Sequence, residues 1–252
     1  MKSYLLAILA FCIIIPTASA EVFVKNDQKF MDSSDSMHIV GEIQNDLQSA
    51  LNQVKLDITL YNSEGKIIDK KTTKSLVNTI MPTMRSPFNL VIPPIQSQDV
   101  DSYSIDLDYN IIVPKSQVID VVSSEISQDR FNNYVINGKI TNNGETTANA
   151  ISVVATMYGD GGKVIAVSKD NIEPDYLRAD HAIPFILPVH DLKERQTIKD
   201  YSIVAESEEY AAVPEFPIGS MILLAGSVSS YIVLTRYSGK AIANCICAAN
   251  PK

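Results

Sequence analysis

Paired histidines, activated serines and glycine-rich loops are the features that would allow this 252-residue chain to catalyse a reaction or to bind a metal or a phosphate. The three histidines, His38, His181 and His190, each stand alone, without the closely spaced second histidine that a zinc site uses. We expect all three at surface or strand-edge positions. No serine lies in a Gly-x-Ser-x-Gly segment, and no glycine-rich phosphate loop occurs. The sequence therefore predicts no catalytic, cofactor-binding or metal-binding residues, and a protein that is not an enzyme.

Four aspartates cluster in the sequence: Asp99, Asp101, Asp106 and Asp108. Calcium needs several oxygens that converge on one point. However, Asp106 and Asp108 alternate with apolar residues, so both should face outward from a single strand. The favoured interpretation is a solvated strand that resists pairing with other sheets, and calcium binding is the alternative.

The cysteines and the net charge exclude other classes of protein. Cys12, Cys245 and Cys247 leave residues 21–244 without a thiol, so the body has no disulfide and depends on its apolar core. The net charge of −8 argues against a nucleic-acid partner, because phosphate binding requires lysine and arginine. An acidic surface favours solubility instead.

The N-terminus has the features of a secretory signal. Lys2 precedes an apolar run over 4–15, and Ala18 and Ala20 form a small-x-small cleavage site. The run is shorter than the ~20 residues of a spanning helix. We predict that residues 1–20 are a signal peptide cleaved after Ala20, with an uncleaved N-terminal anchor as the alternative.

The C-terminus contains a candidate membrane anchor. Residues 217–234 carry no charge, and as a helix they would extend about 27 Å, close to the hydrocarbon thickness of a bilayer. Arg236 and Lys240 follow, which places the C-terminus inside and the preceding residues outside. We predict a transmembrane helix over 217–235 and a short cytoplasmic or processed tail over 236–252. The protein should therefore lie at the cell surface, anchored to the cytoplasmic membrane.

A short motif stands directly before this helix. Pro214, Glu215 and Phe216, the apolar segment and Arg236 together resemble the PEF-CTERM sorting signals of archaeal surface proteins. The resemblance implies an archaeosortase-like processing enzyme that cleaves near the motif and transfers the protein to another anchor. Such signals usually stop soon after the basic residue, whereas this chain continues to Lys252.

The middle of the chain contains the same pattern twice. Residues 41–45 match residues 138–142 at an offset of 138 − 41 = 97. This offset also pairs Asn52 with Asn149, Thr59 with Thr156, Tyr61 with Tyr158, Gly65 with Gly162 and Phe88 with Phe185; after one inserted residue, Tyr103 matches Tyr201. The period is longer than that of solenoid repeats, so each copy should be a whole domain. We place the domains at 21–112 and 115–207.

Both copies read as β-structure. Residues 54–61 and 151–158 alternate between apolar and other side chains, which predicts strands with one buried and one solvated face. Each segment runs into a turn with a glycine, Gly65 or Gly162, at a position that should need positive φ. Several short strands without an amphipathic helix predict an all-β fold of two tandem immunoglobulin-like β-sandwich domains.

The strand before each turn also resembles a known family. Residues 58–62 read Ile-Thr-Leu-Tyr-Asn, and residues 155–159 read Ala-Thr-Met-Tyr-Gly. Together with the Gly-x-Ile-x-Asn opening and the Pro-Phe strand, they are similar to the FxLYD family of extracellular immunoglobulin-like modules. This resemblance implies a sandwich fold and a surface setting, and no activity.

Two linkers complete the predicted organisation. Pro114 interrupts the strand pattern between the domains, and the short linker predicts domains in series with limited play. Residues 206–212 form a charged linker, which predicts a solvated stalk. We place the stalk and the Pro-Glu-Phe motif together over 208–216.

We therefore expect a non-catalytic, membrane-anchored cell-surface protein that displays two modules for protein–protein or envelope interaction. Its partners would be the membrane lipid bilayer and an envelope or membrane protein. The alternative is an accessory single-pass subunit that stabilises a larger membrane complex. Gly226 and Ser230 favour that alternative, because small residues four apart let helices pack closely.

Overall fold

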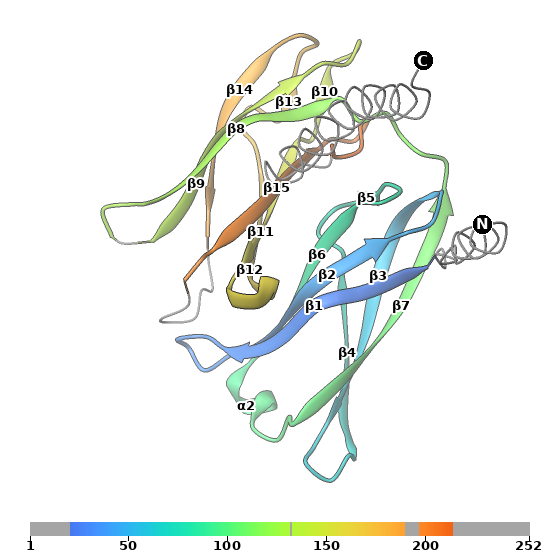
Figure 1. The fold of residues 1–252 in the computed structure, drawn as a ribbon, viewed down its shortest axis with the longest axis vertical. Coiled ribbons are helices and arrows are strands. Elements are labelled where there is room, and N and C mark those ends of the chain that lie inside the picture. The colour runs from blue at the N-terminus through green and yellow to red at the C-terminus, as the bar shows by residue number, and fades with distance from the viewer. Residues whose placement is uncertain (1–20, 132, 190–196, 214–252) are drawn as a thin grey trace, which may run out of the picture. The chain divides into compact units, whose positions relative to one another are not determined.

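Strands make up nearly all the regular structure in the computed structural model, which describes residues 21–131, 133–189 and 197–213 (Figure 1). The all-β prediction is confirmed. Within these residues, no helix has the length and apolar character needed to cross a membrane. The predicted signal peptide over 1–20 and the predicted helix over 217–235 lie outside the described residues.

The first half of the chain contains two antiparallel sheets. One has the order β1 (Val22–Met31), β2 (Met37–Asn45), β6 (Arg85–Ile92). In the other, β3 (Ala50–Tyr61) pairs with β4 (Ile67–Lys74), β5 (Thr79–Ile80) and β7 (Ser102–Ile112). The short helix α2 (Pro94–Ser97) lies between β6 and β7 in the sequence.

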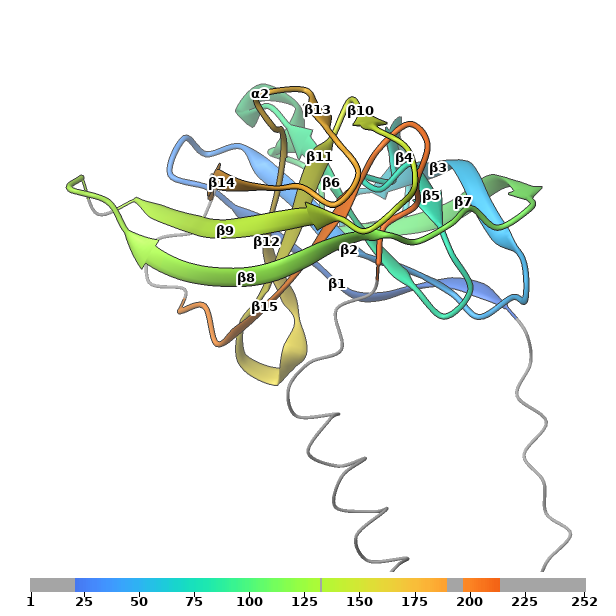
Figure 2. The same ribbon diagram turned by 90° about the horizontal axis from the view of Figure 1, so that it is seen from above.

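The second half repeats this arrangement. One sheet has the order β14 (Ala182–Pro188), β9 (Tyr134–Asn142), β8 (Ile119–Gln128), and β8 and β9 run side by side in Figure 2. The other has the order β12 (Val164–Asn171), β11 (Ser152–Tyr158), β15 (Asp200–Glu206). A small ladder joins β10 (Ala148–Asn149) to β13 (Tyr176–Leu177), and a 3-10 turn, η1 (Asp160–Gly162), connects β11 to β12.

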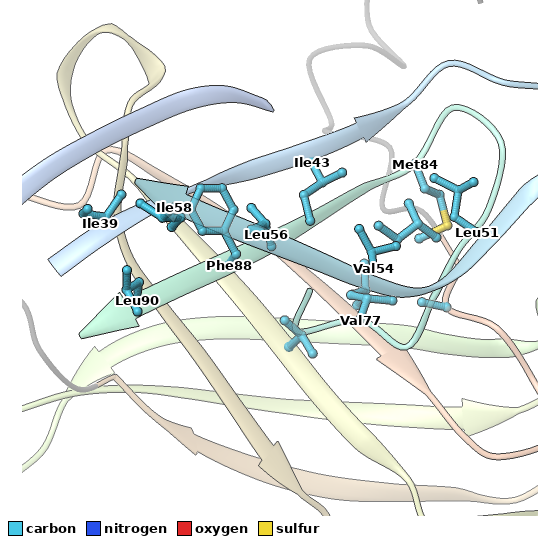
Figure 3. Packing of buried hydrophobic residues seen from close by; sticks show 14 of the residues in the cluster. Ile39, Ile43, Leu51, Val54, Leu56, Ile58, Val77, Met84, Phe88 and Leu90 are labelled. Carbon is cyan, nitrogen blue, oxygen red and sulfur yellow. The ribbon is translucent and has the colours of Figure 1, made fainter. Parts of the chain in front are cut away.

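Each half buries its own apolar core between its two sheets. In the first half, Ile39, Ile43, Leu56, Ile58 and Phe88 are at most 1% exposed and point between the strands (Figure 3). The period-two alternation of β3 explains this, because every second side chain faces the opposite sheet. Each such side chain contributes about 2 kcal/mol by leaving water, which is how a body without disulfides holds its fold. The second core has the same construction: Ile136, Ile140, Val153, Met157, Phe185.

A glycine opposite a phenylalanine recurs in both halves. Gly41 on β2 lies opposite Phe88 on β6, and Gly138 on β9 lies opposite Phe185 on β14. A Cβ atom on Gly41 would come within 2.8 Å of the Phe88 ring, and one on Gly138 would come closer still to Phe185. The ring packs directly over the glycine backbone, so both positions of the repeated pattern exclude a side chain.

A buried asparagine ties two loops together in each half. The Asn45 amide donates to the carbonyls of Ser49, at 2.9 Å, and Ile80, at 3.0 Å. Asn142 repeats both bonds, at 2.8 Å each, to the carbonyls at the matching positions. The recurrence of Asn45 and Asn142 in the sequence is therefore explained by loop closure.

The hairpin turns also keep their chemistry. The carboxylates of Asp32 and Asp129, again 97 residues apart, each accept hydrogen bonds from the backbone N–H groups two and four residues downstream. The N–H of Asn133 is the main cause of a lowered pKa at Asp129. The predicted positive φ is confirmed at both turn glycines, 76° at Gly65 and 72° at Gly162.

We expect the substitutions Asn45→Ala and Asn142→Ala to destabilise the protein by similar amounts, about 2 kcal/mol each, because each removes the donor from one buried and one partly buried carbonyl. Urea unfolding measures the difference. Asn143→Ala, at the adjacent exposed position, is the control and should change the free energy of unfolding by less than about 0.5 kcal/mol. A loss at only one of the two matched positions would contradict the shared role.

Candidate functional site

The outer face of one sheet from each half is covered by the other half. All nine residues of β2 are buried. His38, Val40 and Glu42 point away from the first core, yet each is only 1% exposed. The cover is provided by β12, which lies against β1, β2 and β6. The series arrangement expected from the short linker at Pro114 is therefore replaced by a lateral contact between sheets.

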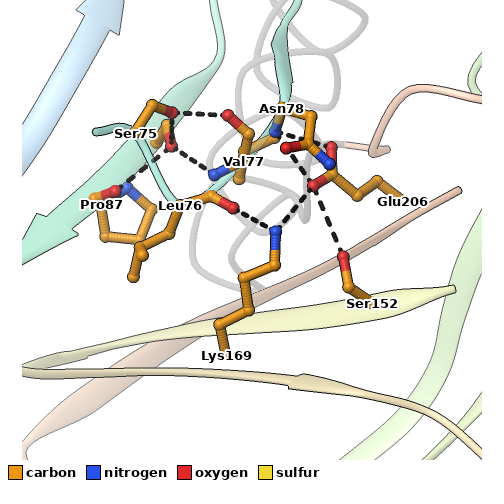
Figure 4. Close-up of polar contacts among 9 residues, drawn as sticks. Ser75, Leu76, Val77, Asn78, Pro87, Ser152, Lys169 and Glu206 are labelled. Carbon is orange, nitrogen blue, oxygen red and sulfur yellow. Dashed lines mark hydrogen bonds and ion pairs between the residues drawn. The ribbon is translucent and has the colours of Figure 1, made fainter. Parts of the chain in front are cut away.

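A buried carboxylate occupies one end of this contact (Figure 4). Both oxygens of Glu206 on β15 accept from the backbone N–H of Asn78, at 3.0 and 2.9 Å. The Lys169 ammonium lies 3.4 Å from Glu206 and donates to the Leu76 carbonyl at 2.7 Å. Ser152 completes the cluster at 3.5 Å from Oε1 of Glu206. Two strands of the second half thus hold the loop before β5 of the first.

The protonation of Glu206 reflects two opposing influences. Burial raises its pKa, while the Asn78 N–H and the Lys169 ammonium lower it, and the net result is a pKa above the ordinary value of 4.5. The free-energy cost of withdrawing a carboxylate from water is several kcal/mol unless partners offset it. The cluster supplies those partners, which makes Glu206 sensitive to the exact placement of the two halves.

A second carboxylate occupies a separate position along β2. Glu42 accepts a 2.6 Å hydrogen bond from the Tyr158 hydroxyl across the contact and one of 2.8 Å from the Asn26 amide. Arg85 lies 3.9 Å away. Burial and the Glu42 charge both raise the pKa of Tyr158, so its hydroxyl remains a donor. In the first half, the matching Tyr61 instead meets Ser104, at 3.1 Å, on an uncovered face.

His38 is not at a surface or strand-edge position, and that expectation is wrong. It lies within β2, and its ring stacks on Phe30 with centroids 5.1 Å apart. Its ring nitrogens lie 3.2 Å from the Asn89 side-chain oxygen and 3.1 Å from Asp32. These contacts give His38 a structural role in closing the β1–β2 hairpin.

The other candidate side chains do not converge. His181 is exposed, with Nδ1 2.8 Å from the Ala179 carbonyl, and His190 lies outside the described residues. Asp106 and Asp108 are exposed on β7, as the alternation predicted. Within the described part of the chain, no group of three or more His, Cys, Asp or Glu side chains could hold a metal ion.

The segment predicted as a solvated stalk is partly docked. Ala211 and Ala212 are fully buried, and the Ala211 N–H donates to the Ser116 carbonyl at 2.9 Å. Upstream, Glu209 accepts from the Asn149 side chain at 2.6 Å. Residues 207–212 are therefore a folded closing segment. The predicted signal residues lie outside the described residues: Ala18, Ala20, Pro214, Glu215, Phe216, Arg236.

An open depression of about 370 Å³ lies on the second half, between residues 171–173 and 184–186. These ranges match 74–76 and 87–89 of the first half at the repeat offset. In the first half, the corresponding surface is where Lys169 donates to Leu76. The depression is the uncovered counterpart of the docking position.

Comparison with known proteins does not assign a family. No protein-family model matches the chain, and no curated protein matches it. Solved structures give weak matches. The exo-chitosanase CsxA of Amycolatopsis orientalis matches at 11% identity and a TM-score of 0.27, over 75% of this chain and 26% of that one. A β-D-mannosidase from Dictyoglomus thermophilum matches at 7% identity and a TM-score of 0.27, over 73% and 29%.

A transglutaminase of red sea bream matches at 8% identity and a TM-score of 0.24, over 77% of this chain and 32% of that one. This chain thus spans only about a quarter to a third of the proteins it matches. TM-scores at this level do not establish a shared fold, and they assign no activity to this chain.

Glu42, Lys169 and Glu206 were not predicted as functional residues. On β11 and β15, local alternation predicts that the side chains facing away from the core are exposed to water. A difference in sequence between the two copies of the repeat does indicate the contact. At the positions of Asp57 and Asp106 the second copy has Val154 and Val204, which indicates a covered face.

We expect Glu206→Ala to lower the free energy of unfolding by about 2 kcal/mol at neutral pH, because the Asn78 N–H loses its acceptor and Lys169 its counter-charge. The control, Glu208→Ala, removes an exposed carboxylate two residues away and should stay within about 0.5 kcal/mol. Equal effects of the two variants would show that the cluster does not hold the contact.

The raised pKa of Glu206 also predicts a pH dependence. The folded state binds the Glu206 proton more tightly than the unfolded state, so this stabilisation is fully present below pH 4.5 and is lost as pH rises through the folded pKa. In Glu206→Gln this titration is absent. The stability of the wild type relative to Glu206→Gln should therefore fall as pH is raised from about 4 to 7. If the stability of the wild type relative to Glu206→Gln instead rose with pH, the pKa of Glu206 would be lowered in the folded state and not raised.

Proposed function

We propose that this protein is a non-catalytic cell-surface module in which two immunoglobulin-like sandwiches act as one rigid body for protein–protein or envelope interaction. The observation that carries the proposal is the contact held by Glu206 and Glu42. A rigid pair offers a partner surfaces from both halves at a fixed spacing, and a partner then loses less entropy on binding than it would with freely jointed domains.

Sequence features support the surface location. The predicted signal peptide exports the body, and the predicted helix over 217–235 holds it at the membrane with the domains outside. The absence of cysteine from 21–244 also suits this setting, since the body does not depend on a particular redox state. The Pro214–Phe216 motif would permit archaeosortase-like processing of the anchor.

The topology can be tested with a single introduced thiol. Ser63→Cys places a cysteine in the exposed β3–β4 turn of a body that has none. A membrane-impermeant maleimide should label this variant on intact cells. Cys245 and Cys247 of the wild type serve as the internal control, and they should react only after the membrane is permeabilised. Labelling in the opposite order would overturn the proposed location.

The intact mass of protein isolated from its native membrane then distinguishes two forms. A mass corresponding to residues 21–252 means a cleaved signal and a permanent helix, which favours the accessory-subunit alternative. A mass ending near Pro214–Phe216 with an added anchor means that the sorting motif is used. That result favours a displayed surface module.

A further inference from the structure

The contact between the halves joins two different faces. The second half contributes the outer face of β12, β11 and β15, and the first half contributes the outer face of β1, β2 and β6. Each half also contains the other kind of face, since both have the same strand order. An interface between unlike faces does not close on itself, so it can continue from copy to copy into a chain of molecules.

The uncovered face that could continue this contact is the outer face of β4, β3 and β7. It shares one cross-strand pair of residues with the covered face of the second half. Thr59 lies opposite Ser104, as Thr156 lies opposite Ser202. The central pair differs. Val154 and Val204 lie opposite each other, at 1% and 9% exposure, within the apolar cluster of the first half.

The first half has aspartates at both of these central positions. Asp57 lies directly opposite Asp106, and both are exposed. The Thr72 hydroxyl donates to Asp57 at 2.6 Å, and among the described residues neither aspartate forms an ion pair with a lysine or arginine. Two like charges at directly opposite positions repel each other, and covering them would also remove two carboxylates from water.

From these observations we infer that Asp57 and Asp106 determine the specificity of the sheet-to-sheet contact. They allow it between the two halves of one chain and prevent it between two copies of the protein. The position that would receive such a sheet is present on the second half. The open depression between 171–173 and 184–186 corresponds to the surface that Lys169 contacts in the first half. Ile186, 65% exposed, lies at its edge. A second copy would dock its first half there if its central pair were apolar.

The test replaces both aspartates with the residues of the second half. The double variant D57V/D106V of the full chain, in detergent, is compared with the wild type by sedimentation velocity across a hundredfold range of concentration. We expect the wild type to remain a single species. The variant should form dimers and longer species, with self-association at least tenfold tighter.

Two further variants separate a specific contact from general adhesion. K55V/K74V adds two valines at opposite positions of the same sheet but keeps both aspartates, and it should behave as the wild type. Adding Ile186→Asp to D57V/D106V should abolish the association, because it places a charge on the receiving surface. The milder D57A/D106A should associate more weakly than D57V/D106V but in the same way.

The inference is overturned if folded D57V/D106V and D57A/D106A both remain monomeric at every concentration. It is equally overturned if the association of D57V/D106V survives Ile186→Asp, if K55V/K74V associates as tightly, or if the wild type already self-associates through this face. None of these measurements depends on the proposed cell-surface role.

Discussion

Two carboxylates withdrawn from water constrain how the halves of this protein pack. Glu206 needs the Asn78 N–H and the Lys169 ammonium, and Glu42 needs the Tyr158 hydroxyl. The bonds from Asn78 to Glu206 and from Tyr158 to Glu42 cross from one half to the other, and Lys169 of the second half also donates to the Leu76 carbonyl of the first. A slide of a few ångströms would leave a buried charge without its partners, which costs several kcal/mol. Burial of apolar side chains between the halves is favourable but not directional, so the hydrogen bonds of the two carboxylates fix the relative position of the halves.

Comparing the two copies of the repeat distinguishes the residues that form the core of each sandwich from the residues that form the contact between the halves. Gly41 with Phe88 and its counterpart in the second half serve the inner faces, where any sandwich must fill its core. The outer faces carry no such obligation, because a sheet presents alternate residues to opposite sides. Asp57 and Val154 therefore occupy the same place in the same fold, one in water and the other covered.

Much of the fold could be predicted from sequence because its rules are local. Alternation placed Leu56 in the core and Asp106 outside, and the offset of 97 identified Asn142 as the equivalent of Asn45. The burial of His38 and Glu206 could not be predicted in this way. Their partners depend on packing between segments far apart, with Asn78 and Glu206 separated by 128 positions in the chain. Alternation reports which side a residue faces, and not what covers that side.

Fixing the two halves also changes what the remaining faces can do. A flexible pair would sample many orientations, and a partner touching both domains would have to select one of them at an entropic cost. Here the outer faces of β4-β3-β7 and β8-β9-β14 belong to one packed body. The same packing would align an apolar patch for repeated head-to-tail contact. On the inference drawn above, charge at Asp57 and Asp106 is the condition under which a body of two packed halves stays monomeric, because the geometry alone would allow it to polymerise.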